Sequence, residues 1–244
     1  MQKYFISDSD FENKMITSDD VFHIKNVMRS KVGDEILIGN NSKCYLAKIT
    51  KINNKDVLFE IEEEKIGNTE LPVFVTLFQG YPKVDKMADI IKHSTELGVY
   101  EIVPTIMKRS LFKLNEDKRD NKLIRFNKIA KEAAEQSYRM IVPKVLDIVN
   151  LKKIDFSKYD KKILCFEEDA KDGKLKGLSS VVTNLNKGDK VAILIGPEGG
   201  IDMEEYEYLT SLGFISCALG KRILRTETAS FYALSAISYE LEVR

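Results

Sequence analysis

Cysteine and histidine are scarce in this chain, which excludes several kinds of site. Its 244 residues include three cysteines and two histidines. No two of these residues have the close spacing of zinc ligands, so we expect no metal. The cysteines are odd in number and far apart, which predicts free, buried thiols in a reducing compartment. They are Cys44, Cys165 and Cys217.

Long apolar runs are missing as well. No segment approaches the roughly 20 apolar residues that a bilayer-spanning helix needs. Residues 1–8 also lack the apolar stretch of a signal peptide. We therefore expect a protein of the cytoplasm, without a membrane partner.

The chain has no net charge, because 38 lysine and arginine residues balance 38 aspartate and glutamate residues. The charge is unevenly distributed, however. Residues 83–162 hold 19 basic residues against 12 acidic ones, whereas residues 1–70 hold 10 against 13 and residues 163–244 hold 9 against 13. A regional excess of positive charge is typical of a phosphate-binding face, although solvated helix faces produce the same pattern.

Two glycine-containing segments near the C-terminus are the most informative feature. They are L-I-G-P-E-G-G at 194–200 and L-G-K-R-I-L-R-T-E-T-A at 219–229. Each follows an apolar, strand-like run and leads toward a helix. Glycine permits a close approach of ligand to backbone, and open α/β sheets bind ligands at the carboxyl ends of their strands. We expect the two loops to lie at neighbouring strand ends and to form one pocket.

The familiar nucleotide-phosphate patterns are absent from these loops. Neither G-x-x-x-x-G-K-[ST] nor G-x-G-x-x-G occurs. The second loop instead carries Arg222, Arg225, Glu227 and Thr228 beside its glycine, more polar groups than a chain reversal needs. A different kind of cofactor is therefore expected.

The order of predicted elements indicates two domains. Residues 1–70 show short alternating strands separated by turns, which is typical of a small barrel, and the polar run from Glu62 to Glu70 predicts a linker. Residues 71–244 alternate strands with helices, which predicts an α/β fold with a largely parallel sheet. The expected strands are 35–38, 43–49, 57–61, 73–78, 101–104, 163–166, 191–195 and 217–219, and the expected helices are 19–29, 84–97, 121–139 and 227–242.

The two glycine segments resemble the cofactor site of the SPOUT methyltransferases, and more narrowly that of the ribosomal RNA small subunit methyltransferase E family. Other pieces extend the resemblance over nearly the whole chain. They are K-H-S-T-E-L-G-V at 92–99, Pro104, K-R-S at 108–110, E-A-A-E-Q-S at 132–137, Arg139 and Pro143.

This resemblance implies a fold, an activity and partners. Residues 71–244 would form a SPOUT-type α/β methyltransferase domain with a C-terminal trefoil knot, preceded by a PUA-like RNA-binding β-barrel over residues 1–70. The activity would be S-adenosylmethionine-dependent methylation of uridine N3 in 16S ribosomal RNA of the small subunit, by a homodimer. Two alternatives remain open: a SPOUT enzyme acting on another RNA, such as a transfer RNA ribose, or a non-catalytic RNA-binding module.

The resemblance also assigns site residues. Residues implied to bind the cofactor are Ile195, Gly196, Pro197, Glu198, Gly199, Gly200, Leu219, Gly220, Ile223, Leu224, Arg225, Thr228 and Ala229. Residues implied to bind RNA are Lys3, Arg29, Arg109, Arg139 and Arg222.

Arg225 and Glu198 are the candidate catalytic residues. Arg225 offers a permanently charged, planar guanidinium for the uracil anion or a phosphate, but an ion pair with Glu227 or Glu198 would also explain it. Glu198 would act as a base if burial raised its pKa, or it would cap the helix that starts near Asp202.

Three other features allow two interpretations each. Arg139 either faces RNA or belongs to a solvated helix face, and His93 is either a base or a structural residue. The apolar stripe of the last helix is either a dimer contact or ordinary core. The stripe comprises Phe231, Leu234, Ile237 and Leu241.

Overall fold

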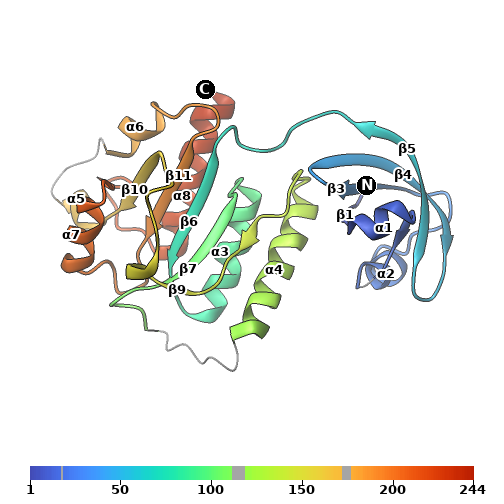
Figure 1. The fold of residues 1–244 in the computed structure, drawn as a ribbon, viewed down its shortest axis with the longest axis horizontal. Coiled ribbons are helices and arrows are strands. Elements are labelled where there is room, and N and C mark those ends of the chain that lie inside the picture. Colours follow the sequence, from blue (N-terminus) through green and yellow to red (C-terminus); the bar gives the residue numbers. More distant parts are fainter. Residues whose placement is uncertain (18, 112–118, 172–176) are drawn as a thin grey trace. The chain divides into compact units, whose positions relative to one another are not determined.

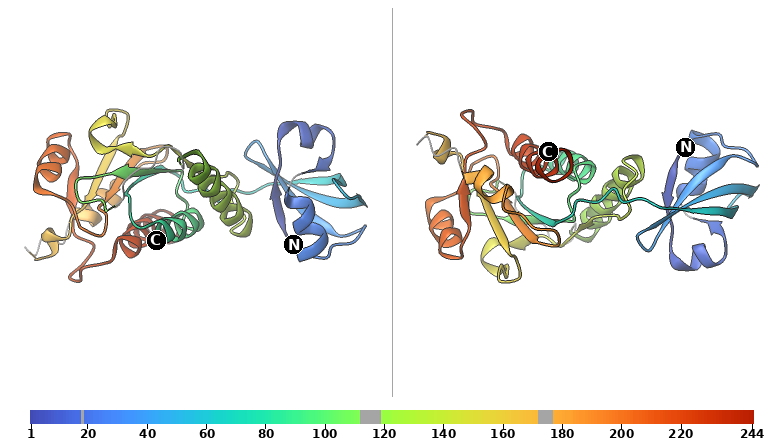
Figure 2. Two further views of the ribbon diagram at one scale, coloured as in Figure 1. Left: turned by 90° about the horizontal axis from the view of Figure 1, so that it is seen from below. Right: turned by 90° about the horizontal axis from the view of Figure 1, so that it is seen from above.

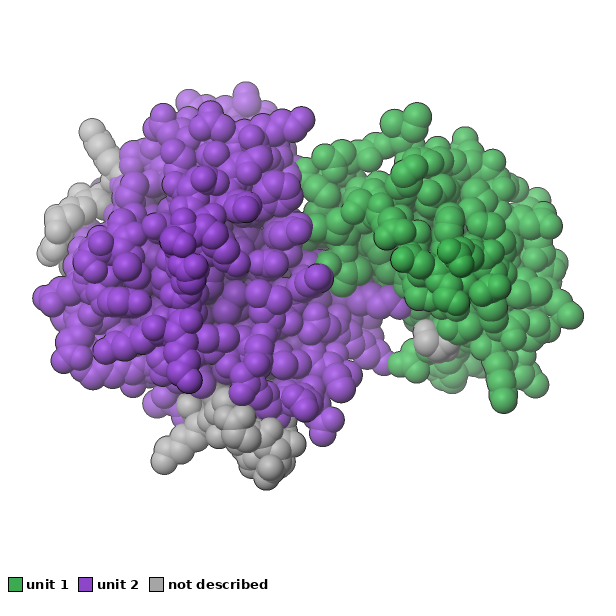
Figure 3. Space-filling view, in the orientation of Figure 1, with its two compact units in different colours: residues 1–70, 134–142 green, residues 71–133, 143–244 purple. Residues whose placement is uncertain are grey.

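The computed structural model of the chain describes residues 1–17, 19–111, 119–171 and 177–244. These residues form two compact units, distinguished by colour in Figure 3. Unit 1 comprises residues 1–70 and 134–142, and unit 2 comprises residues 71–133 and 143–244. Unit 1 therefore includes a segment, 134–142, that the sequence places in the second domain.

Unit 1 is built on a five-stranded sheet (Figure 1). Its order is β1-β3-β4-β5-β2, with β1 parallel to β3 and the other pairs antiparallel. Apolar residues that alternate along the strands pack into one core with the helix α2, among them Ile38, Ile49 and Phe59. The elements are β1 (Lys3–Phe5), α1 (Asp8–Glu12), β2 (Met15–Ile16), α2 (Asp19–Phe22), the π-helical turn η1 (His23–Val27), β3 (Glu35–Asn40), β4 (Lys43–Ile52) and β5 (Val57–Lys65).

One turn of this sheet has a strained-looking but favourable backbone, and one strand extends beyond its predicted end. Asn41 and Ser42 join β3 to β4 with φ values of 47° and 60°, the backbone that two-residue hairpins favour because it matches strand twist. The acidic run Glu62–Glu64 lies inside β5 and pairs with β4. The prediction that this run begins a linker is therefore wrong, because backbone pairing continues while the three side chains remain exposed.

A buried polar cluster holds residues 134–142 in unit 1. The Arg139 guanidinium is 2% exposed and pairs with the Glu70 carboxylate, with Nε 3.1 Å from Oε2. Glu70 also accepts from the backbone N–H of Met140 at 2.7 Å. Lys3, 1% exposed, donates to the Arg139 carbonyl, and burial lowers the pKa of Lys3. Neither cation is available to RNA, so the structure contradicts the predicted RNA contacts at Lys3 and Arg139, and also the solvated face proposed for Arg139.

Unit 2 contains a seven-stranded sheet in which every neighbouring pair is parallel. Its order is β12-β10-β11-β6-β7-β8, and β9 also pairs with β7. The central strand β11 is buried from Val191 onward, as expected for a parallel sheet covered on both faces. The α/β prediction is confirmed. The strands are β6 (Phe74–Gly80), β7 (Glu101–Ile106), β8 (Lys144–Val145), β9 (Val149–Asn150), β10 (Lys161–Cys165), β11 (Lys190–Ile195) and β12 (Ile215–Cys217).

Helices α3 and α8 lie side by side on one face of this sheet (Figure 2). Leu234 and Ile237 of α8 are fully buried within the unit, so that part of the predicted stripe is core. Phe231 packs edge-on against the ring of His93, with centroids 5.3 Å apart. The helices are α3 (Val84–Glu96), α4 (Arg119–Gln136), the 3₁₀ turn η3 (Leu151–Lys153), α5 (Glu168–Lys171), α6 (Gly177–Val182), α7 (Met203–Ser211), α8 (Thr226–Ser238) and the π-helical turn η4 (Tyr239–Val243).

Two kinds of feature are not found in the described ranges. No helix there has the length and apolar character to cross a bilayer. Nor do three histidine, cysteine, aspartate or glutamate side chains gather there as a metal site would require.

The buried pair in unit 1 predicts a large effect of one substitution. Arg139→Ala leaves the Glu70 carboxylate without its cation, so we expect the free energy of unfolding to fall by about 3–5 kcal/mol. Urea unfolding of the full chain measures this change, with Lys55→Ala, an exposed residue of the same unit, as the control. A change as small as that of the control would contradict a structural role for Arg139.

Candidate active site

The sheet order places four strand ends side by side at one edge. β10 lies between β11 and β12, and β6 flanks β11 on its other side. The expectation that the two glycine loops follow neighbouring strands is therefore wrong: they stand on either side of β10, because the chain crosses to the far edge before forming β12. The segment that follows β10, Phe166 and Glu167, consequently lies between the two loops.

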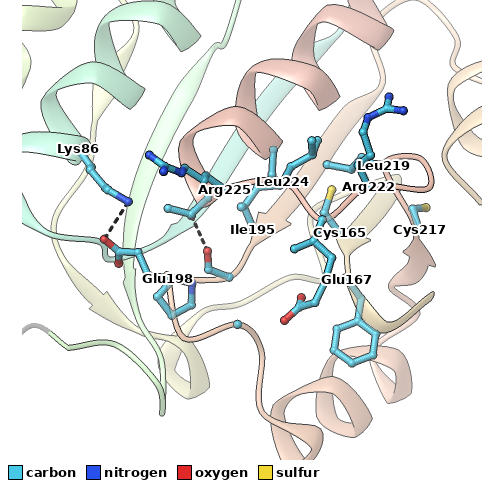
Figure 4. A pocket seen from close by; sticks show the side chains of 17 residues that line it. Lys86, Cys165, Glu167, Ile195, Glu198, Cys217, Leu219, Arg222, Leu224 and Arg225 are labelled. Atoms are coloured by element: carbon cyan, nitrogen blue, oxygen red, sulfur yellow. Dashed lines mark hydrogen bonds and ion pairs between the residues drawn. The ribbon is translucent and has the colours of Figure 1, made fainter. Parts of the chain in front are cut away.

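A cavity of about 390 Å³ opens between these segments (Figure 4). Most residues predicted to bind a cofactor line it, whereas Gly199, Gly220 and Thr228 do not. Sequence reasoning missed six lining residues, which come from α3, from the ends of β10 and β12 and from the start of α8. The lining residues are Lys86, Cys165, Phe166, Glu167, Ile195, Gly196, Pro197, Glu198, Gly200, Cys217, Leu219, Arg222, Ile223, Leu224, Arg225, Thr226 and Ala229.

The two glycines that end the first loop serve different purposes. Gly200 lines the cavity with φ at 74°, and a Cβ there would lie 2.2 Å from Glu167 Oε1. A Cβ at Gly199 would instead lie 2.9 Å from the backbone oxygen of Arg109. A side chain at Gly199 would therefore collide with the loop after β7 and would not enter the cavity.

A buried threonine hydroxyl joins the two loops. Thr226 Oγ1 donates to the Gly196 carbonyl at 2.6 Å and accepts from Gln79 Nε2 at 2.8 Å. Ser230 donates to Gln79 Oε1 at 2.5 Å. All three side chains are buried, so the first turn of α8 is fixed to the ends of β11 and β6 by hydrogen bonds that exclude water.

Lys86 of α3 pairs with a carboxylate from each loop. Its Nζ lies 3.5 Å from Glu198 Oε1 and 3.3 Å from Glu227 Oε2. Glu198 Oε1 also lies 3.3 Å from the backbone nitrogen of Lys83, at the start of α3. The N-cap of α7 is Asp202, so the prediction that Glu198 caps that helix is wrong.

Arg225 stands immediately before α8, and Figure 4 shows it directed toward the Lys86 side of the cavity. It is exposed, and it forms no ion pair with Glu198, Glu227 or any other described carboxylate. The ion-pair alternative for Arg225 is therefore contradicted, since Lys86 is the partner of both carboxylates. The proposed roles of Arg225 and Glu198 in chemistry remain predictions.

The remaining arginines predicted to bind RNA are exposed. Arg222 lies on the cavity rim, and Arg29 belongs to unit 1. Arg109 pairs with Asp202, with NH2 3.4 Å from Oδ2, and NH1 lies 3.4 Å from the Gly199 carbonyl. Lys108 also binds Asp202 at 3.0 Å and lowers the pKa of that carboxyl. RNA contacts at these three arginines remain predictions.

His93 and the cysteines provide no base or nucleophile. The His93 Nδ1 atom lies 3.0 Å from Glu96 Oε2, and His93 does not line the cavity, so the structure favours its structural interpretation. Cys165 and Cys217 face each other across β10 and β12. Burial raises the pKa of Cys217 to about 12 and that of Cys165 well above its usual value, so both thiols stay protonated at neutral pH.

Comparison with known proteins gives consistent matches over both units. Residues 69–238 match the RNA methyltransferase domain family, and residues 16–62 match the RNA methyltransferase PUA domain. The chain is 42% identical to ribosomal RNA small subunit methyltransferase E of Bacillus subtilis, over 100% of this chain and 98% of that protein. The Mesomycoplasma hyopneumoniae protein of the same name is 33% identical, over 96% of this chain and 98% of its own.

A solved structure agrees with these matches. Ribosomal RNA small subunit methyltransferase E from Neisseria gonorrhoeae, bound to S-adenosyl methionine, is 28% identical with a TM-score of 0.78. The alignment covers 98% of this chain and 97% of that one.

The threonine bridge can be tested by removing one hydroxyl. Thr226→Val keeps the side-chain shape but leaves the Gly196 carbonyl without this donor, so we expect a loss of about 1–3 kcal/mol in unfolding free energy. Thr228→Val, two residues along on the exposed side of α8, is the matched control. Equal unfolding midpoints for the two variants would contradict the proposed importance of the bridge.

Proposed function

Because the chain belongs to the ribosomal RNA small subunit methyltransferase E family, we propose that it methylates N3 of a uridine in 16S ribosomal RNA, with S-adenosylmethionine as the donor. The observation that carries this proposal is the cavity at the carboxyl ends of β10, β11 and β12, which both glycine loops line. The Neisseria gonorrhoeae relative binds the same donor.

The cavity suits this cofactor chemically. Ile195, Leu219 and Leu224 supply apolar walls for an adenine ring. Carboxylate and guanidinium groups stand in the same cavity, matching a ligand that carries charges of both signs. When bound, S-adenosylmethionine supplies a methyl group on a positively charged sulfur.

Residues of the chain would then prepare the uracil. N3 must lose its proton before it can accept a methyl group. Glu198 Oε2 is buried and has no hydrogen-bond partner in the described part of the chain, whereas Oε1 is occupied by Lys83 and Lys86. We assign Oε2 the role of proton acceptor. Arg225 is exposed and has no ion pair with a described residue, and its guanidinium would stabilise the resulting uracil anion.

RNA binding would combine the two units. The PUA match over residues 16–62 and the positive excess over residues 83–162 both support an RNA substrate. We place this reaction in the cytoplasm, on the small ribosomal subunit. The position of the methyl group in the product distinguishes this reaction from the alternative, methylation of a transfer RNA ribose.

We further propose a homodimer formed through residues 71–244. Tyr232 of α8 and Tyr239 after it are 46% and 59% exposed, and Ile223 at the cavity rim is 64% exposed. Large apolar groups exposed on one side of a protein favour a contact with another protein. The trefoil knot also stays a prediction, implied by the family.

The proposed reaction predicts that one variant loses turnover but keeps its affinity for the cofactor. Arg225→Ala should lower methyl transfer by about 10²–10³-fold, because it removes the group acting on the uracil anion, while the Kd for S-adenosylmethionine changes little. Calorimetry measures binding. Labelled cofactor and small subunits lacking the modification measure transfer, with exposed Lys187→Ala as the control.

Mapping the product by mass spectrometry decides the target of this reaction. We expect methylation at a uridine N3 of 16S ribosomal RNA. A methyl group on a ribose or on a base carbon would reject the proposed reaction. Unchanged turnover in Arg225→Ala would reject only the role of that residue.

Light scattering at micromolar concentration tests the dimer. We expect twice the mass of one chain for the unmodified protein. Tyr239→Asp should shift the mass toward one chain, because it places a charge in the apolar contact. Tyr100→Asp, on another exposed part of the same unit, should not. A single-chain mass for the unmodified protein would reject the dimer.

A further inference from the structure

Two carboxylates line the cavity, and they differ in their pairing. Glu198 is paired with Lys86. Glu167 forms no ion pair or hydrogen bond with any residue of the described ranges, although it is half-buried in the cavity wall. A carboxylate that is partly removed from water is stabilised by a cation or by hydrogen-bond donors. A bound ligand would supply the partner that Glu167 lacks among the described residues.

The fold holds Glu167 at the centre of the site. It follows β10 by two residues, and β10 lies between the strands that precede the two glycine loops. Its carboxylate reaches the turn at Gly200. Oε1 occupies space that any side chain at Gly200 would need, at 2.2 Å from an ideal Cβ. Glycine at position 200 is therefore what allows this carboxylate to lie against the first loop.

The described neighbouring groups are engaged elsewhere and form no ion pair with Glu167. The Arg109 guanidinium approaches the same turn, with NH1 3.9 Å from the ideal Cβ of Gly200, but it is bound to Asp202 and to the Gly199 carbonyl. The Gly200 N–H donates to the Pro197 carbonyl at 2.9 Å. Arg222 extends away from Glu167 at one end of the cavity, and Arg225 lies on the Lys86 side.

We propose that Glu167 is a cofactor-binding residue whose carboxylate pairs with a cationic group of S-adenosylmethionine. This inference rests on the proposed function. The ligand has two such groups, the sulfonium and the α-ammonium. Either one is a positively charged partner for the Glu167 carboxylate. A pair with the sulfonium would have a further consequence, because methyl transfer turns the sulfonium into a neutral thioether and so weakens the binding of the product.

Three ligands distinguish the two cationic groups as possible partners of Glu167. S-adenosylmethionine carries both, S-adenosylhomocysteine carries only the α-ammonium, and 5′-methylthioadenosine carries neither. Binding of each is measured by calorimetry to the full chain and to Glu167→Gln, which removes the charge and nearly preserves the shape. We expect Glu167→Gln to weaken the binding of S-adenosylmethionine by about tenfold or more. The affinity for 5′-methylthioadenosine should not change.

The effect of Glu167→Gln on the affinity for S-adenosylhomocysteine identifies which cation pairs with Glu167. Unchanged binding of this product assigns Glu167 to the sulfonium, and an equal loss assigns it to the α-ammonium. Equal loss of all three ligands would overturn the proposal, because the contact would then be to the adenosine or to the shape of the pocket. Equal affinities of the variant and the unmodified chain for S-adenosylmethionine would also overturn it.

Two controls complete the test. Glu168→Gln removes the adjacent, exposed carboxylate, which does not line the cavity, and should bind all three ligands normally. Glu167→Asp keeps the charge and should recover part of the lost affinity. Failure of the unmodified chain to bind S-adenosylmethionine would reject the proposed function itself.

Discussion

The site depends on one buried hydrogen-bonded bridge. Thr226 connects the Gly196 carbonyl to the Gln79 amide, and Ser230 completes the contact to Gln79. These groups belong to the first loop, to the start of α8 and to the end of β6. A buried polar group without a partner is costly, so the three segments are held in one arrangement. The bridge therefore connects the first loop to the segment that follows the second loop, on one side of the cavity.

Ion pairs of unit 2 connect further helices and loops to the segments around the cavity. Lys86 ties α3 to Glu198 and Glu227, one from each loop. Asp202 ties the loop after β7 to the start of α7 through Lys108 and Arg109. These pairs satisfy most of the carboxylates near the cavity. Among the described residues that line the cavity, Glu167, Arg222 and Arg225 are charged and form no ion pair with another described residue.

Unit 1 shows that a basic residue in an RNA-binding family need not face RNA. Arg139 and Lys3 are enclosed in a polar cluster with Glu70. Desolvating a guanidinium requires a paired carboxylate, and Glu70 supplies it while also accepting backbone N–H groups. These two residues therefore belong to the internal contacts of unit 1, and the proposed RNA contact would need other, exposed cations.

The sequence by itself determined the elements and most of the cavity wall. Buried strands such as β6 and β11 can be recognised as short continuous apolar runs, and helix α3 by its hydrophobic periodicity. The glycine loops can be recognised from the sequence because the residues of each motif follow one another along the chain. Short elements such as β1 and β2 were missed, since two or three residues carry no periodicity.

Only the tertiary structure decided which distant segments meet. It placed β10 between the two loop-bearing strands, which brought Glu167 into the cavity. It paired Lys86 with Glu198 and Glu227, and it buried Arg139 and Lys3. Strand order and ion pairing depend on contacts between residues far apart in the chain, and no local pattern of side chains encodes them.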